Sequence, residues 1–366
     1  MCIKKVHWSI TGKCNFKCKH CFLNEIKSKN MEPSLNFCLD LINQMSEYGI
    51  EEVSLTGGEP LCRKDFFCIV DALSRKNIKL TEINTNGSLV NEKFLEKLEL
   101  RKIRPEFSIS FDGLNFHDWF RGTEGAQYLA ENAFYLLNSK KFETSATICM
   151  HKRNLKTLEK NIDFLTSLGV KTVYTNQIIV TDTCKIKKEI PSVYELYEAY
   201  LDYIPKFFKR KSPINLVLGG FFICKKGSKN YSIPAKKYNK TEKNLPFQSI
   251  CPHAKNKVYI APDTSVLPCM PLLTANNNFK RAFLLKVSFK EAIESYFYKK
   301  IMNTQLSDLF SKNSKCKKCK KKYVCAGGCR AFALNFKKNI FDCDENSCYF
   351  FKNNYEQKIK MQLTNI

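Results

Sequence analysis

Short apolar runs alternate with longer amphipathic segments through the first half of the chain. Predicted strands cover Lys5–Ile10, Glu52–Leu55, Lys79–Thr85, Glu106–Phe111, Glu143–Cys149 and Val170–Thr175. Between them, apolar residues at helical spacing predict a helix capped by Ser34 that carries Leu35, Leu39, Ile42 and Met45, and further helices over Lys64–Ser74, Asn91–Leu98, Ala126–Ser139 and Leu155–Leu168. Strands and helices that alternate in this way predict βα units around a parallel sheet.

The segments that follow the first four predicted strands are rich in polar, glycine or cysteine residues. They are the cysteine loop Cys14–Cys21, Gly57–Pro60, Thr85–Gly87 and Ser110–Gly113. In parallel α/β arrangements, binding and catalytic residues collect at the carboxyl ends of the strands. The four segments therefore predict one shared site at that end of the sheet.

The alternation fades after about residue 185, and we expect three regions. Residues 1–185 form the core of βα units, residues 186–250 form a bridging segment, and residues 251–366 form a cysteine-rich domain that ends in a helix. Within the bridging segment, Lys225–Lys243 is rich in Lys, Gly, Ser, Asn and Pro, which predicts an inserted loop.

Length and composition allow a sizeable core, since the chain has 366 residues of which 44% are hydrophobic. No run of about 18 apolar residues is present, and the first residues lack the apolar core of a signal peptide. We therefore expect a cytoplasmic protein without a membrane partner. The net charge is +25, but the lysines are scattered over many segments, so nucleic-acid binding is not inferred.

The chain has 18 cysteines, an unusual number for a protein expected in a reducing compartment. Disulfides are rare there, so the cysteines favour metal or redox chemistry. Seven sit singly beside apolar residues and are expected to be small core residues: Cys2, Cys38, Cys62, Cys68, Cys149, Cys184 and Cys224. The other 11 stand at or near motif-like spacings.

Cys14, Cys18 and Cys21 form a C-x3-C-x2-C run after the first predicted strand. Three thiolates are one short of the four that a cubane iron–sulfur cluster takes, so one iron would stay open to a substrate or cofactor. The alternative is zinc, which usually fills four positions with two cysteine pairs. The run fits zinc poorly, because its nearest further donor is His20.

Together with Gly57-Gly58-Glu59-Pro60, the cysteine run resembles the radical S-adenosylmethionine (SAM) enzymes. The resemblance implies a partial (β/α)6 TIM-type barrel, in which the open iron of a [4Fe–4S] cluster is chelated by SAM. Reductive cleavage of SAM then gives a 5′-deoxyadenosyl radical that abstracts hydrogen from the substrate.

The resemblance also implies a SAM pocket. Gly57, Gly58, Glu59 and Pro60 would bind the amino group of SAM, and His20 would pack near the adenine. Ser110 and Arg121 match positions that bind the ribose or carboxylate, and a planar guanidinium suits a carboxylate. Thr85 and Asn86 are expected to shape the same pocket.

The C-terminal run Cys316-x2-Cys319-x5-Cys325-x3-Cys329 resembles the SPASM extension, which holds auxiliary [4Fe–4S] clusters. The resemblance implies two clusters. Cys316, Cys319 and Cys325 would hold the outer one with a late cysteine, Cys348 or alternatively Cys343. Cys251, Cys269 and Cys329 would hold the inner one, whose fourth position falls to Cys224 or stays open. Residues 261–269 resemble the hairpin that delivers Cys269. A zinc ribbon remains an alternative for these cysteines.

SPASM relatives mostly act on peptides, which implies a radical SAM peptide maturase that makes a thioether or another side-chain cross-link. Formylglycine formation is a weaker alternative, because Met270 stands where relatives of that type carry an aspartate. A small-molecule or tetrapyrrole substrate is a further alternative, and a zinc-ribbon binding protein is the last. No residue is assigned as the catalytic base.

The expected partners are a peptide substrate and a reductant such as flavodoxin or ferredoxin. The first predicted strand begins close to Met1, so a separate protein or the basic insertion is expected to recruit the substrate. The positive charge suits a peptide with an acidic leader.

Overall fold

The computed structural model describes residues 3–25, 31–181, 183–226, 230–236, 242–251, 256–275 and 281–364. Cys2 and two parts of the Lys225–Lys243 insertion, residues 227–229 and 237–241, lie outside the described residues.

The predicted alternation of strands and helices is confirmed from residue 5 to residue 177. The strands are β1 (Lys5–Ser9), β2 (Glu52–Thr56), β3 (Lys79–Thr85), β4 (Glu106–Ser110), β5 (Thr144–Met150) and β6 (Thr172–Gln177). The helices are α1 (Leu35–Tyr48), α2 (Phe66–Arg75), α3 (Glu92–Leu100), α5 (Ala126–Ser139) and α7 (Leu158–Ser167), with short helices α4 (His117–Arg121) and α6 (Lys152–Leu155). Neighbouring strands from β1 to β6 pair in parallel.

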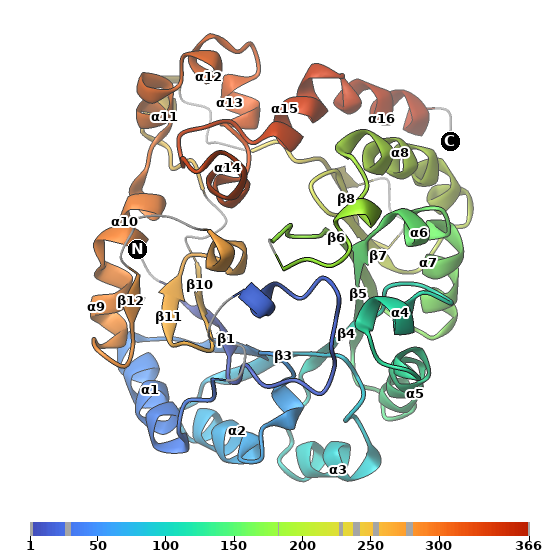
Figure 1. Ribbon diagram of the computed structural model, residues 1–366, viewed down its shortest axis with the longest axis vertical. Coiled ribbons are helices and arrows are strands. Elements are labelled where there is room, and N and C mark those ends of the chain that lie inside the picture. The colour runs from blue at the N-terminus through green and yellow to red at the C-terminus, as the bar shows by residue number, and fades with distance from the viewer. Residues whose placement is uncertain are drawn as a thin grey trace.

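The sheet continues beyond these strands at both edges. Its order is β12-β11-β10-β1-β2-β3-β4-β5-β6-β7-β8-β9, so the described strands form an open, curved sheet with the helices on its outside (Figure 1). One edge ends in β7 (Asn215–Leu218), β8 (Phe222–Cys224) and β9 (Tyr231–Ser232). The other ends in β10 (Lys257–Ile260), β11 (Ser265–Leu267) and β12 (Ala282–Phe283).

The expected end of the alternation near residue 185 is wrong. Helix α8 (Val193–Lys209) follows, capped by Ser192, and leads into β7, which pairs in parallel with β6. The buried face of α8 consists largely of tyrosine and phenylalanine, including Tyr200, whose hydroxyl lies 2.6 Å from the Thr175 hydroxyl of β6. Tyrosine carries a polar hydroxyl on a large apolar ring, so its periodicity is a weak helical signal in the sequence.

Short helices make up most of the C-terminal region. They are α9 (Phe289–Glu294), α10 (Tyr296–Asn303), α11 (Leu306–Lys312), α12 (Ser314–Lys318), α13 (Lys322–Cys325), α14 (Arg330–Lys337), α15 (Glu345–Lys352) and α16 (Tyr355–Thr364). The last helix packs against α8, where the Tyr355 hydroxyl donates to Glu198 at 2.7 Å. None of the described helices combines the length and apolar character needed to cross a membrane.

The C-terminal region joins the sheet through β10, which pairs in parallel with β1 from Lys5↔Lys257 to Trp8↔Ile260. Strands β10 and β11 form the expected hairpin before Cys269, with Thr264 at its turn in the left-handed region at φ 69°. Because β1 leads into the cysteine loop, this pairing places the hairpin beside that loop.

Candidate active site

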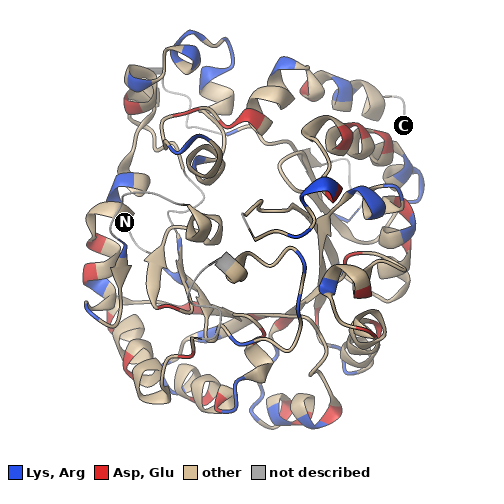
Figure 2. Cartoon of the chain, viewed as in Figure 1, with Lys and Arg blue, Asp and Glu red and all other residues tan. Residues whose placement is uncertain are grey.

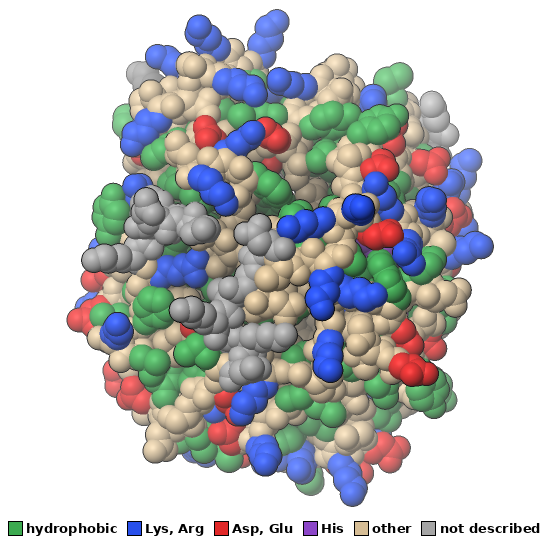
Figure 3. Space-filling view, in the orientation of Figure 1, with side chains coloured by type: hydrophobic (Ala, Val, Ile, Leu, Met, Phe, Trp, Pro, Cys, Tyr) green, Lys and Arg blue, Asp and Glu red, His purple; other side chains and the backbone are tan. Residues whose placement is uncertain are grey.

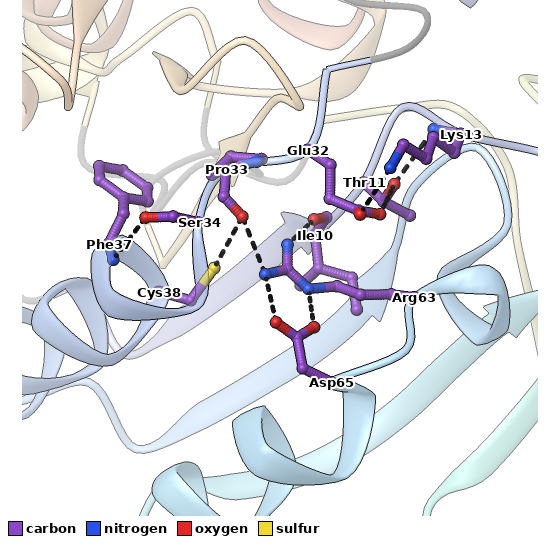
Figure 4. Close-up of polar contacts among 10 residues, drawn as sticks. All are labelled: Ile10, Thr11, Lys13, Glu32, Pro33, Ser34, Phe37, Cys38, Arg63 and Asp65. Atoms are coloured by element: carbon purple, nitrogen blue, oxygen red, sulfur yellow. Dashed lines mark hydrogen bonds and ion pairs between the residues drawn. The ribbon is translucent and has the colours of Figure 1, made fainter.

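Arg63 holds the two ends of the segment that carries Cys14, Cys18 and Cys21. Its buried guanidinium donates from Nη1 to the Ile10 carbonyl at 2.6 Å and from Nη2 to the Pro33 carbonyl at 2.8 Å (Figure 4). Asp65 faces the same guanidinium, with Nε 2.5 Å from Oδ1. One side chain thus fixes where the cysteine loop leaves β1 and where the chain enters α1.

Glu32 makes a second set of hydrogen bonds that holds the cysteine loop. Its carboxylate accepts from the Thr11 hydroxyl at 2.7 Å and from Lys13 Nζ at 2.9 Å (Figure 4). Burial alone would raise the pKa of Glu32, but the hydrogen bonds from Lys13 and Thr11 lower it below its usual range. The ionised carboxylate therefore joins the end of the loop to its beginning.

Gly57 and Gly58 lie against the backbone of the cysteine loop. The Gly58 N–H donates to the Thr11 carbonyl at 2.7 Å, and the Glu59 N–H donates to the Lys13 carbonyl at 2.8 Å. A Cβ on Gly57 would lie 2.4 Å from the Thr11 oxygen, and one on Gly58 would lie 2.3 Å from the Lys13 oxygen. The glycines therefore serve a close approach, as the sequence predicts, but their described partner is the loop itself.

Glu59 is fully buried and accepts three hydrogen bonds. They come from the Thr85 hydroxyl at 2.7 Å, the Asn86 N–H at 2.7 Å and the Leu61 N–H at 3.2 Å. Burial raises the pKa of Glu59 to about 7, against the opposing effect of these donors. Glu59 therefore ties the segment after β2 to the segment after β3, and Pro60 begins the short 3-10 helix Pro60–Cys62 beside it.

Asn86 connects the same network to the cysteine loop. Its side-chain amide donates to Asn15 Oδ1 at 2.9 Å, and Asn15 in turn donates to the Ser88 hydroxyl at 2.8 Å. The predicted grouping of Thr85 and Asn86 with Gly57–Pro60 is thus present as a continuous set of hydrogen bonds. Asn15 and Ser88 belong to it as well, although the sequence analysis did not single them out.

Arg121 lies in α4 with its guanidinium between Asp112 and the cysteine loop. Its Nε donates to Asp112 Oδ2 at 2.6 Å, and its Nη1 lies 3.9 Å from Cys18 Sγ. Burial alone would lower the pKa of Arg121, but Asp112 and Cys18 raise it above its usual range. Ser110, at the end of β4, pairs in register with Thr147 of β5 and precedes Asp112 by two residues.

Phe120 lies between two histidine rings. His20 stacks on it with ring centroids 4.0 Å apart, and His151 stacks on it at 4.8 Å. Burial lowers the pKa of His20 to about 3 and that of His151 to about 4, so both rings are neutral at pH 7. His20 Nδ1 and His151 Nε2 are buried without a hydrogen-bond partner among the described residues. His151 directly follows β5, so the strand-end rule that identified the other segments also applies to it.

The three thiols of the cysteine loop influence one another. Removal from water raises the pKa of Cys14 to about 12, and Glu59, Cys18 and Cys21 add to the rise. Within the described parts of the chain, no group of three or more His, Cys, Asp or Glu side chains converges on a point that suits a single metal ion. In a cubane cluster each thiolate binds its own iron, so its ligands need not converge in that way. Three neighbouring thiols and an unpartnered His20 nitrogen fit a cluster together with a polar ligand.

The predicted inner cysteines lie near one another. Burial raises the pKa of Cys269, and the charges of Cys329 and Cys251 raise it further. Cys269 and Cys21 pack against the same small hydrophobic cluster, which includes Leu23. Cys269 of the predicted inner set therefore shares a hydrophobic cluster with the end of the cysteine loop. Cys224 lies buried in β8 within the main hydrophobic core.

The predicted outer cysteines also gather, and both candidates for the late ligand are present. Burial raises the pKa of Cys348 to about 12, and Cys343, Cys325 and Cys316 raise it further. The charge of Cys343 likewise acts on Cys316, as does that of Cys319. The geometry therefore keeps both Cys343 and Cys348 as candidates.

Asp344 and Arg330 hold the loops between these cysteines. Asp344 Oδ2 accepts from the Cys329 N–H at 3.0 Å, and Arg330 Nη1 donates to the carbonyls of Ile340 and Asp342 at 2.5 and 2.9 Å. Toward the parallel sheet, Asn346 Nδ2 donates to Gln177 Oε1 at 2.6 Å, which connects α15 to the end of β6.

Comparison with known sequences decides the family of this site. Residues 8–165, which contain the cysteine loop and the Gly57–Pro60 segment, match the model of the radical SAM superfamily. They form a radical SAM domain. Enzymes of this superfamily use a [4Fe–4S] cluster and SAM for radical reactions, and the protein is an enzyme of this kind.

Three relatives extend the comparison beyond this domain. The AdoMet-dependent heme synthase of Methanosarcina barkeri is 26% identical over 337 residues, which are 90% of this chain and 91% of that protein. Streptococcus suis SuiB bound to its precursor peptide SuiA has a TM-score of 0.72 at 18% identity, covering 95% of this chain and 76% of that one. The enzyme anSMEcpe with AdoMet and the Cp18Cys peptide has a TM-score of 0.69 at 16% identity, covering 99% of both chains. The two solved structures show that this chain shares their overall fold along nearly its whole length.

Replacing Arg63 with Met is expected to lower the free energy of unfolding by about 3 kcal/mol, because it removes charged hydrogen bonds from the Ile10 and Pro33 carbonyls. Arg101→Met is the matched control, because Arg101 pairs with Asp71 at a partly exposed position. This substitution should lower the free energy of unfolding by about 1 kcal/mol or less. Urea unfolding measures both. Equal losses in the two variants would contradict the role given to Arg63.

Glu59 should give the domain a pH-dependent stability. The protonated carboxyl favours the folded state fully below its ordinary pKa of 4.5, and this contribution is lost as pH rises to about 7. Relative to that of Glu59→Gln, the free energy of unfolding of the wild type should therefore fall by about 3 kcal/mol between pH 4.5 and pH 7. Thermal unfolding across this range measures the difference, with exposed Glu124→Gln as control. A difference that stays constant with pH would contradict the burial of an ionisable Glu59.

Proposed function

We propose that the protein is a radical SAM peptide maturase that oxidatively modifies side chains of a ribosomally made peptide, forming a thioether or another cross-link. Cys14, Cys18 and Cys21 hold the SAM-binding [4Fe–4S] cluster. Cys251, Cys269 and Cys329 hold an inner auxiliary cluster, and Cys316, Cys319 and Cys325 hold an outer one with Cys348 or Cys343.

The observation that carries this proposal is the contact between the two cysteine regions. Cys21 of the radical SAM domain and Cys269 of the C-terminal region pack against the same hydrophobic cluster, although they are 248 positions apart in the sequence. Auxiliary clusters beside the SAM site are placed to accept an electron from a substrate radical. SuiB and anSMEcpe, whose fold this chain shares, are described with bound peptides.

The chain's own residues would hold and shield the reacting groups. The bound cluster and SAM would supply a carbon radical that abstracts hydrogen from the substrate. Arg121 would remain cationic beside Cys18 and is placed to receive a carboxylate of the cofactor. His20 and His151 are neutral and flank Phe120, which lines the site with apolar and aromatic surface.

A basic pocket beside the cysteine loop supports a substrate with acidic residues. Its volume is about 650 Å³, and it is lined by Lys19, Trp119, Cys184, Lys185, Ile186, Lys187, Lys188 and Glu189. The Lys185 N–H donates to the Lys19 carbonyl at 3.1 Å, which ties this pocket to the loop between Cys18 and Cys21. Figure 3 shows basic side chains gathered on this part of the face, between β6 and α4.

The pocket differs from the rest of the basic surface. Figure 2 shows that Lys and Arg are spread over most elements, which agrees with a general excess of lysine. Within the pocket, however, four lysines meet only one carboxylate, and that Glu189 already pairs with Arg153 at 3.0 Å. An acidic peptide segment bound here would lie next to the SAM site.

Charge reversal tests this peptide site. Lys187→Glu with Lys188→Glu should weaken binding of a fluorescein-labelled Glu/Ala decapeptide by about tenfold or more, because each reversed pair contributes about 1 kcal/mol at the surface. Fluorescence anisotropy measures binding, and the exposed pair Lys290→Glu with Lys299→Glu is the matched control with equal net charge. Equal weakening by both pairs would mean that only the overall charge attracts the peptide, and the pocket assignment would fail.

A tetrapyrrole substrate is the second candidate, and it is favoured by the match to the heme synthase along nearly the whole chain. Release of 5′-deoxyadenosine by the reduced enzyme separates the two candidates. Stimulation by acidic peptides, with none by iron coproporphyrin III, is the result expected from the proposal. Stimulation by iron coproporphyrin III alone would replace the peptide substrate with a tetrapyrrole.

A further inference from the structure

Lys236 lies within the segment that the sequence predicts as an inserted loop, yet its ammonium group is largely buried among the C-terminal cysteine loops. Its Nζ donates to the Gly328 carbonyl at 3.0 Å, to the Ala326 carbonyl at 3.4 Å and to the Ile250 carbonyl. Its backbone N–H donates to the Val324 carbonyl at 2.9 Å. An ammonium has three hydrogens to donate, and all three have an acceptor here.

Each of these carbonyls neighbours a cysteine in the sequence. Ile250 precedes Cys251, Ala326 follows Cys325, and Gly328 precedes Cys329. The three loops come from distant parts of the chain or from opposite sides of a tight turn, in which Gly328 has a φ of 77°. One ammonium therefore fixes the spacing between cysteines of the inner set and a cysteine of the outer set.

The charge of Lys236 has no carboxylate partner among the ion pairs of the described residues. A buried cation is costly without a compensating negative charge. The nearby groups that can carry such a charge are Cys251, Cys325 and Cys329, while the charge of Arg330 repels the ammonium. Lys236 is thus placed to balance thiolates rather than to form an ordinary ion pair.

We propose that Lys236 is a positioning residue that spaces the Cys251, Cys325 and Cys329 loops and makes the clusters bound there easier to reduce. The inference rests on the auxiliary clusters of the proposed function. A fixed cation near a cluster stabilises the form that has gained an electron, since that form carries one more negative charge. Lys236 would thereby help the C-terminal clusters to accept electrons.

The test uses the reconstituted full chain with Cys14, Cys18 and Cys21 changed to Ala, so that only C-terminal clusters are observed. Lys236→Met removes the charge while keeping an unbranched side chain, and Lys236→Arg keeps the charge. Lys225→Met, at an exposed lysine of the same segment, is the matched control. Iron content and an EPR-monitored redox titration are measured for each variant.

Lys236→Met should shift the midpoint potential of the C-terminal clusters to more negative values, while Lys236→Arg and Lys225→Met leave it near the starting value. If Lys236→Met loses its iron, recovery of iron in Lys236→Arg supports the need for a cation, and loss in both overturns it. Normal iron content with an unchanged potential in Lys236→Met also overturns the proposal. Absence of C-terminal iron in the starting protein would instead contradict the auxiliary clusters of the proposed function.

Discussion

The parallel pairing of β1 with β10 is the constraint on which the rest of the arrangement depends. Four residue pairs, from Lys5↔Lys257 to Trp8↔Ile260, join the first strand of the radical SAM domain to the first strand after Cys251. The cysteine loop follows β1, and β11 returns antiparallel to β10 before the chain reaches Cys269. Strand pairing therefore brings the β10–β11 hairpin to β1, and the loops that follow β1 and β11 place Cys21 and Cys269 against one hydrophobic cluster.

A second common feature is how the loops around the thiols are held. Single charged side chains, each bonded to several backbone carbonyls, fix loops that contain little regular structure. Arg63 does this for the cysteine loop, Arg330 for the loop around Asp342, and Lys236 for the segments at Cys251 and Cys329. Buried carbonyls need donors, and a guanidinium or ammonium supplies several at once. Arg330 and Lys236 also offset negative charge on nearby cysteines, so in the C-terminal region the support of the loops and the electrostatics are linked.

Local signals in the sequence predict the strands β1 to β6 to within a few residues and group Gly57–Pro60, Thr85 and Asn86 at one end of the sheet, whereas Arg121 is assigned from the family resemblance. They succeed because period-two and helical patterns, together with strand-end positions, are local properties. Contacts between distant residues are not local, which is why Arg63, Glu59's network and Lys236 were not assigned these roles. The glycines illustrate the limit: the need for close approach was predicted, but the partner proved to be the Thr11 and Lys13 carbonyls. Helix α8 was not predicted because tyrosine and phenylalanine make up most of its buried face, and tyrosine is a weak apolar signal.

The most direct test of the account is the iron and sulfide content after anaerobic reconstitution, for the wild type and for the variant in which Cys14, Cys18 and Cys21 are replaced by Ala. One SAM-binding cluster and two auxiliary clusters predict about 12 irons per chain, falling to about 8 in the variant, with four irons per cubane cluster. About four irons falling to none, with zinc bound at the C-terminal cysteines, would show that those cysteines are structural. The proposed auxiliary electron acceptors would then be wrong.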